Sequence, residues 1–162
     1  MTKFDRSFVL TILHATPDIA RQVAVYAVTR ACEFSGLADE LWIRDALVAL
    51  GDNSAMPAPF DDISHVGDAF ARLSTQEGAS VNSAVFVRCV GEDLADNPFG
   101  TNNEPRYMTI PALYSAQDQD TYKAAIETVF HASCAYGSHA GELHAEIRRE
   151  LADMDRTSRG QP

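Results

Sequence analysis

The stretch DDISHVGDAFARLSTQEG, residues 61–78, carries the clearest structural signal in this chain. Its apolar residues recur at steps of three and four: Ile63, Val66, Phe70 and Leu73. That spacing is typical of the buried side of an amphipathic helix. Asp61 stands where an N-cap is expected, and Gly78 closes the pattern. The stretch therefore predicts a helix with one apolar face against a core and one acidic face toward solvent.

Helical patterns with marked ends lie on both sides of this stretch. Thr16 and Pro17 form an N-cap followed by proline at the first helical position, and Gly36 ends that segment. Asp39 can cap the next helix, in which Leu41 and other apolar residues point inward and Gly51 takes the left-handed position after the last turn. We expect helices over residues 17–36, 39–51, 61–78, 81–95, 118–136 and 138–154.

Residues 97–111 interrupt the helical patterns. They contain three prolines, Gly100 and the pair Asn102-Asn103, so we expect a long loop that is either functional or mobile. Strand patterns are nearly absent, and residues 107–110 are the one short candidate. The sequence therefore predicts an all-α, single-domain bundle of five to seven helices over residues 1–155, with a frayed tail over 156–162.

The charge of the chain is strongly negative and unevenly placed. With 23 acidic and 13 basic residues the formal net charge is -10. Residues 33–77 hold nine acids and two arginines, and residues 92–120 hold six acids and one arginine. Such a field disfavours binding to nucleic acids and to anionic membranes, and it favours fast encounter with a cationic partner.

Three cysteines, Cys32, Cys89 and Cys134, are widely spaced and odd in number, which favours buried free thiols in a reducing cytoplasm. The apolar patch at residues 8–13 is short and lacks a clear small-residue cleavage site, so no signal peptide is predicted. No apolar run approaches the roughly 20 residues that span a bilayer. We expect a cytoplasmic protein.

One region contains residues that can bind a metal: His131, Cys134, His139, His144, Glu142 and Glu146. It lacks the HExxH and CxxC spacings, and Gly137 interrupts the helix between its members. Cys134 with His131 or His139 is a second candidate, as a nucleophile and base, but a helix C-terminus disfavours the thiolate. We predict no cofactor and no enzyme, and keep a metal-dependent helical enzyme as the alternative.

Two segments resemble a group of small all-helical bacterial proteins of unknown function. The first is VAVYAVTRACEF, residues 23–34, and the second is the closing pattern of His139, Glu146, Arg149 and Asp153. Between them, Asn82-Ser83-Ala84 is similar to the group's alanine-rich central helix. The chain also resembles bacterial immunity proteins in being small, helical and strongly acidic. That resemblance implies a toxin or nuclease with a basic groove as the partner.

The first hypothesis is therefore an acidic module that binds a basic protein, as an immunity protein neutralises a toxin. The carboxylates expected to make the contact are Asp61, Asp62, Asp68 and Glu77, then Glu92, Asp93 and Asp96. Arg106 and Tyr107 are expected to anchor the interface, since interface hot spots favour these residue types. A homo-oligomer that packs through the helices over 81–95 and 118–136 is a further alternative.

Overall fold

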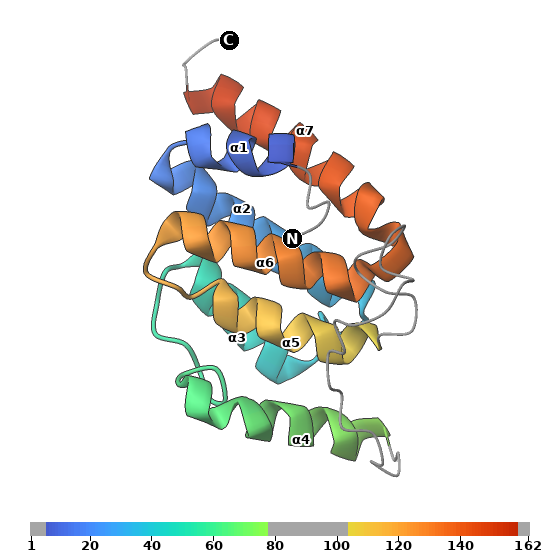
Figure 1. Cartoon of the computed structure of the whole chain (residues 1–162). Helices are drawn as coiled ribbons and strands as arrows, with labels where there is room; N and C mark the ends of the chain where they lie inside the picture. Colours follow the sequence, from blue (N-terminus) through green and yellow to red (C-terminus); the bar gives the residue numbers. More distant parts are fainter. Residues whose placement is uncertain (1–5, 78–103, 159–162) are drawn as a thin grey trace.

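The computed structural model describes residues 6–77 and 104–158, and all the regular structure in them is helical (Figure 1). The all-α bundle predicted from the sequence is confirmed. Its α-helices are α1 (Arg6–His14), α2 (Pro17–Phe34), α3 (Leu41–Gly51), α4 (Val66–Glu77), α5 (Pro105–Ser115), α6 (Thr121–Tyr136) and α7 (Ala140–Ser158). Two 3-10 turns are η1 (Ile63–His65) and η3 (Gly137–His139). Among the described helices, none combines the length and apolar character needed to cross a bilayer.

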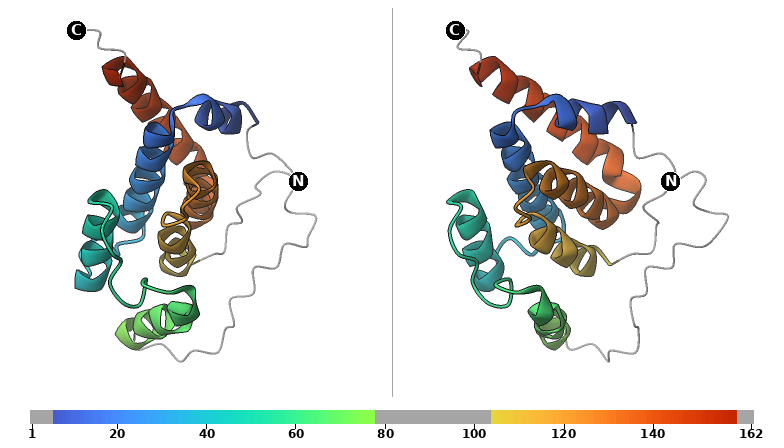
Figure 2. Two further views of the ribbon diagram at one scale, coloured as in Figure 1. Left: turned by 90° about the vertical axis from the view of Figure 1, so that its left-hand side faces the viewer. Right: turned by 60° about the vertical axis from the view of Figure 1, so that its left-hand side comes forward.

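Helices α2 and α6 pack against each other at the centre of the bundle. Helix α5 lies beside α6, α3 lies beside α2, and α1 and α7 cross one end while α4 lies at the other (Figure 2). Alanines line the buried face of α2: Ala20, Ala24, Ala27 and Ala31. Because an alanine side chain is one methyl group, these positions allow α6 to approach closely, as ridges pack into grooves. Helix α6 keeps a partly exposed outer face, where Phe130 is 43% exposed, so the homo-oligomer alternative stays a prediction.

Several helix ends follow the sequence prediction. The Thr16 hydroxyl accepts a hydrogen bond from the Ile19 N–H at 3.4 Å, and Pro17 is the first residue of α2. Gly36, at a φ of 71°, and Gly137, at a φ of 55°, hold the left-handed backbone just past α2 and α6. Helix α6 begins later than the predicted residue 118, because Asp120 caps it and accepts hydrogen bonds from the N–H groups of Tyr122 and Lys123.

Helix α3 differs from its prediction at both ends. Its N-cap is Glu40 rather than Asp39, with no side-chain cap bond, and Gly51 is its last helical residue. The positive φ falls on Asn53, at 51°, because asparagine also tolerates the left-handed region. Leu41, expected to point inward, is 66% exposed. The helix turns Ile43, Ala46 and Leu50 toward the core instead.

The helix predicted over residues 61–78 is shorter than expected, because a 3-10 turn precedes it. The Asp62 carboxylate accepts a hydrogen bond from the Ser64 N–H at 2.7 Å and caps η1, so α4 begins only at Val66. The tighter turn takes Ile63 out of the register of α4 and leaves it 66% exposed. Of the four apolar residues predicted to face the core, Leu73 is fully buried, and Ala69 is buried beside it.

The loop prediction over residues 97–111 is wrong where the structure describes it. Pro105 occupies the first turn of α5, where a missing N–H costs nothing, and the strand candidate at 107–110 is helical. Pro111 lies inside α5, where proline costs about 3 kcal/mol. Burial of Met108, Ile110 and Leu113 offsets that cost.

At the two ends of the chain the structure also goes beyond the prediction. Residues 8–13, expected only to be an apolar patch, lie in α1, which buries Phe8 and Ile12. Helix α7 continues through Ser158, past the predicted end near Met154. The helix predicted over 81–95 and the first part of the predicted loop lie outside the described residues.

Candidate functional site

The three carboxylates Asp61, Asp62 and Asp68 lie together where η1 leads into α4, and all three are exposed. The Asp61 carboxylate is 2.9 Å from Nδ1 of His65, and this hydrogen bond lowers the pKa of Asp61 and raises that of His65. The bond from the Ser64 N–H lowers the pKa of Asp62. Asp61 and Asp62 are therefore ionised at neutral pH, and both also organise the local turn.

The rest of the predicted acidic site is only partly described. Glu77 is the last residue of α4, and its side chain lies outside the described residues. Glu92, Asp93 and Asp96 lie outside them altogether. The prediction for these four carboxylates stays a prediction.

Arg106 and Tyr107, predicted as interface anchors, are half-buried and make contacts within the bundle, and their role at an interface stays a prediction. Arg106 Nη2 lies 3.5 Å from the Glu40 carboxylate, across the gap between α5 and the start of α3. The Tyr107 hydroxyl is 3.1 Å from the Ser74 hydroxyl, and its ring stacks on Phe70. Both residues therefore connect α5 to its neighbours in the bundle.

Helix α3 carries further exposed acidic residues, which were not among the predicted site residues. Asp45 and Asp52 are exposed, and Val48 is a 58% exposed apolar residue between them. With Leu41 and Ile63, Val48 is among the most exposed large apolar side chains in the described chain. The seven-residue spacing of Leu41 and Val48 places them on one face of a helix, but the sequence does not distinguish an exposed face from a buried one.

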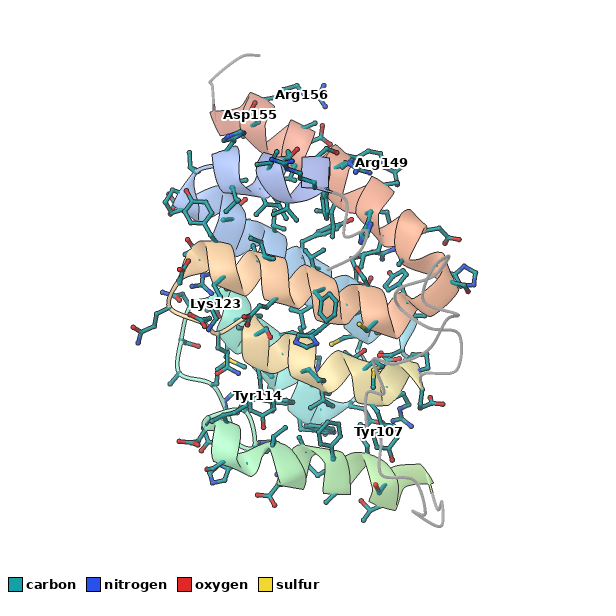
Figure 3. All side chains as sticks on the ribbon, viewed as in Figure 1. Tyr107, Tyr114, Lys123, Arg149, Asp155 and Arg156 are labelled. Carbon is teal, nitrogen blue, oxygen red and sulfur yellow. The ribbon has the colours of Figure 1, made fainter. Side chains whose placement is uncertain are left out.

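Charge is distributed unequally between the two ends of the bundle. Residues 37–77, which contain α3 and α4, carry eight acidic residues and two arginines. The other described segments, 6–36 and 104–158, carry eleven acidic and eight basic residues. Figure 3 shows Arg149 and Arg156 on α7, at the end of the molecule opposite α4. The α3–α4 end, meaning residues 37–77, is therefore the negative pole of the described structure.

Ion pairs neutralise acids mainly away from this pole. Arg30 on α2 binds Glu146 on α7 through two hydrogen bonds, of 2.8 and 3.1 Å, and also pairs with Glu33. Further pairs join Asp118 to Lys123 and Asp153 to Arg156. At the α3–α4 end the pairs are Asp61 with His65 and Glu40 with Arg106.

Aromatic side chains pack together between α3, α4 and α5. The rings of Trp42 and Phe60 stack with their centroids 5.4 Å apart, and the guanidinium of Arg72 lies 5.5 Å from the Trp42 ring. Tyr114, which lies on α5 facing α4 in Figure 3, donates a hydrogen bond to the Pro59 carbonyl at 2.8 Å. Burial, with the nearby aspartates, raises the pKa of Tyr114 to about 12. This packing fixes the turn that carries Asp61 and Asp62.

The side chains of the predicted metal-binding region do not meet at one point. The His139 ring pairs with Glu142 at the exposed start of α7, while Glu146 is held by Arg30. His131 is half-buried on α6, and burial lowers its pKa. Among residues 6–77 and 104–158, no group of three or more His, Cys, Asp or Glu side chains is placed to bind a metal. The metal alternative therefore has no ligand set in the described chain.

Ser133 and His144 form a pair that resembles a nucleophile and its base, at a distance of 2.8 Å. The buried Ser133 hydroxyl, however, donates its one proton to the Val129 carbonyl at 2.6 Å. The serine oxygen must then accept from His144, which is the reverse of the direction that activates a nucleophile. The pair joins α6 to α7 and is structural.

The two described cysteines are free thiols. Cys32 is buried, and desolvation raises its pKa to about 12, so it is a poor nucleophile. Cys134 is half-buried in the last turn of α6, near the helix C-terminus as expected.

A groove of about 840 Å³ lies between the start of α2, the end of α3 and the connection from α5 to α6. Its one arginine, Arg21, donates hydrogen bonds of 2.6 Å to the carbonyls of Ala116 and Asp118, which close the end of α5. The remaining polar lining is mainly amide side chains, among them Gln22, Gln117 and Gln119. With Asp18 as its one carboxylate, the groove offers mainly hydrogen-bonding groups.

Comparison with known proteins adds no relative: no family model, no curated protein and no solved structure matches this chain.

Proposed function

We propose that this protein is an acidic binding module whose α3–α4 end binds a cationic protein in the cytoplasm. The partner class is a basic toxin or nuclease domain, which the protein neutralises as an immunity protein does. The observation that supports this proposal is the placement of charge: residues 37–77 carry eight acids against two arginines, and their helix α4 lies at the end opposite Arg149 and Arg156 of α7 (Figure 3). Complementary charge accelerates encounter and selects the partner.

The local chemistry at this end also fits a binding surface. Asp45 and Asp68 are exposed, and within the described residues neither of them accepts a capping hydrogen bond or forms an ion pair. The aromatic packing of Trp42 and Phe60 holds the surface in one shape. A preformed charged surface loses little conformational entropy on binding, which favours affinity.

The test is a charge reversal at each pole. The partner is first purified with the wild-type protein from its source cells, and its affinity is then measured by calorimetry at low and high salt. Asp45→Lys combined with Asp68→Lys should weaken binding by about tenfold or more and reduce its salt dependence. The matched control, Glu142→Lys with Asp153→Lys on α7, makes the same change in net charge and should alter affinity less than about twofold.

Equal losses for both pairs would mean that only net charge matters, and unchanged affinity for the first pair would remove the α3–α4 end as the site. A toxin or nuclease partner should also lose its activity when the wild-type protein is bound. A partner that keeps full activity in the complex would contradict neutralisation while leaving the binding surface intact.

A further inference from the structure

The outer face of α3 carries an alternation of apolar and acidic side chains. At about 100° per residue, Leu41, Asp45, Val48 and Asp52 fall within roughly 60° of one another around the helix axis. Leu41 is 66% and Val48 58% exposed, and the two aspartates are exposed as well. We call these four residues the α3 stripe. Arg44 borders the stripe on the side of Val48.

The α3 stripe contains large exposed apolar side chains, which the acidic surface of α4 lacks. The exposed residues of α4 are small, polar or charged, among them Asp68, Ala71 and Thr75. Protein interfaces generally need an apolar centre that loses its water, surrounded by a polar rim. In α3, by contrast, Leu41 and Val48 are large apolar residues that lie exposed on one face of the helix.

We propose that the α3 stripe binds a cationic amphipathic helix of the protein partner. This inference rests on the proposed function and identifies which part of the acidic end makes the central contact. Leucine-like side chains of the partner helix pack against Leu41 and Val48, while its lysines or arginines face Asp45 and Asp52. The carboxylates beside the two apolar residues select a cationic partner by complementary charge.

The dimensions of the stripe suit a helix. From Leu41 to Asp52 the stripe extends over about 16 Å at 1.5 Å per residue, or roughly three turns. Its apolar residues are seven positions apart, so a partner helix with apolar residues at the same interval can pack alongside. An anionic membrane or a nucleic acid would meet like charge at Asp45 and Asp52.

The inference is tested with three labelled peptides and the full chain, by fluorescence anisotropy. The first is a helical peptide with leucines on one face and lysines on the other. The second has the same lysines with alanine in place of leucine, and the third has the same leucines with glutamate in place of lysine. We expect the lysine–leucine peptide to bind at least about tenfold more tightly than either of the others.

Variants then locate the contact. Leu41→Ser with Val48→Ser should weaken binding of the lysine–leucine peptide by about tenfold and leave the lysine–alanine peptide unaffected. Leu13→Ser on α1, which alters an exposed leucine at the opposite end, is the matched control and should change nothing. Asp45→Asn with Asp52→Asn should weaken both cationic peptides and reduce their salt dependence.

Three outcomes would overturn the inference. Equal binding of both cationic peptides, insensitive to Leu41 and Val48, would show that charge acts alone, and the proposed function would survive. A melting temperature of the unliganded Leu41→Ser, Val48→Ser variant that falls by much more than the roughly 1–2 °C due to the lower helix propensity of serine would show that the chain itself covers the stripe. Failure of every cationic peptide to bind would also exclude the stripe, whereas the proposed function is judged separately, by reversal of Asp45 and Asp68 with the native partner.

Discussion

Arg30 is the residue that ties the centre of the bundle to α7. Its guanidinium binds the Glu146 carboxylate in a two-bond arrangement, and this hydrogen bonding raises the pKa of Arg30 further above its ordinary value. The Tyr136 hydroxyl donates to the Arg30 carbonyl at 3.3 Å, which brings α6 into the same contact. Planar, two-bond pairing of arginine with carboxylate is more specific than a single surface ion pair.

Removal of this arginine should therefore destabilise the fold more than removal of its exposed partner. We expect Arg30→Met to lower the free energy of unfolding by about 1–2 kcal/mol, since Glu146 is left without its donor at a half-buried site. Glu33→Gln, which alters only the exposed pair, should cost less than about 0.5 kcal/mol. Urea unfolding followed by circular dichroism measures both, and equal effects would mean that the contact between α2 and α7 contributes little.

His65 and Asp61 provide a second test at the residue scale. The folded pKa of His65 is raised, chiefly by its hydrogen bond to Asp61, so its stabilising effect is complete below the ordinary value near ~6.5 and is lost as pH rises through the raised pKa. The pKa of Asp61 is lowered, so its contribution is present above ~3.9 and is lost as pH falls through the lowered pKa. The pair thus stabilises the turn at mildly acidic to neutral pH.

An NMR titration of the His65 ring measures this coupling directly. Asp61→Asn should return the His65 pKa most of the way to its ordinary value. Asp68→Asn, which removes a carboxylate with a smaller electrostatic effect on the same histidine, should lower it less. A larger effect from Asp68→Asn would mean that the hydrogen bond is not formed in solution.

At the scale of the element, α6 depends on its cap. The Asp120 carboxylate accepts two backbone hydrogen bonds, of 3.0 and 3.1 Å, at the start of the central helix. Asp118, just outside the helix, pairs with Lys123, and this contact lowers the pKa of Asp118. The cap therefore determines where the connection from α5 ends.

Loss of this cap should cost about 1 kcal/mol in the free energy of unfolding, because two N–H groups lose their acceptor in Asp120→Ala. Asp120→Asn keeps a capping oxygen and should cost only a few tenths of that amount. Thermal and urea unfolding of the two variants give the comparison. A loss of similar size in both would assign the effect to the negative charge rather than to the hydrogen bonds.

At the scale of the whole molecule, the dominant feature is the concentration of negative charge over residues 37–77. Like charges held at one end repel one another and oppose folding, and added salt screens this repulsion. At the opposite end, α7 mixes acidic residues with basic ones, among them Arg148 and Arg149, so its charges partly cancel. Self-repulsion should therefore come mainly from the α3–α4 end.

Sodium chloride should raise the melting temperature of the wild-type protein by a few degrees, about 2–4 °C for a gain near ~1 kcal/mol. The triple variant Asp39→Asn, Asp45→Asn, Asp52→Asn should begin at a higher melting temperature and gain less from salt. A variant with Glu142→Gln and Asp153→Asn should keep most of the wild-type salt response. A wild-type melting temperature that falls with salt would show that ion pairs outweigh repulsion.

The sequence alone determined the helical class and most of the helix ends. Thr16 before Pro17, Gly36 and Gly137 act through backbone geometry and hydrogen bonds within a few residues, so neighbouring residues suffice to predict them. The excess of acids between residues 33 and 77 was equally visible, since it is a matter of composition.

Only the tertiary structure decided which face of each helix is buried. Leu41 fits an inward position by spacing, yet α3 turns Ile43, Ala46 and Leu50 inward and leaves Leu41 in solvent. Pro111 would break a helix in isolation, and burial of its neighbours in α5 retains it. Arg106 and Tyr107 likewise became internal contacts once α5 packed beside α4. These outcomes depend on residues distant in the chain, because burial is a property of the assembled core rather than of any one segment.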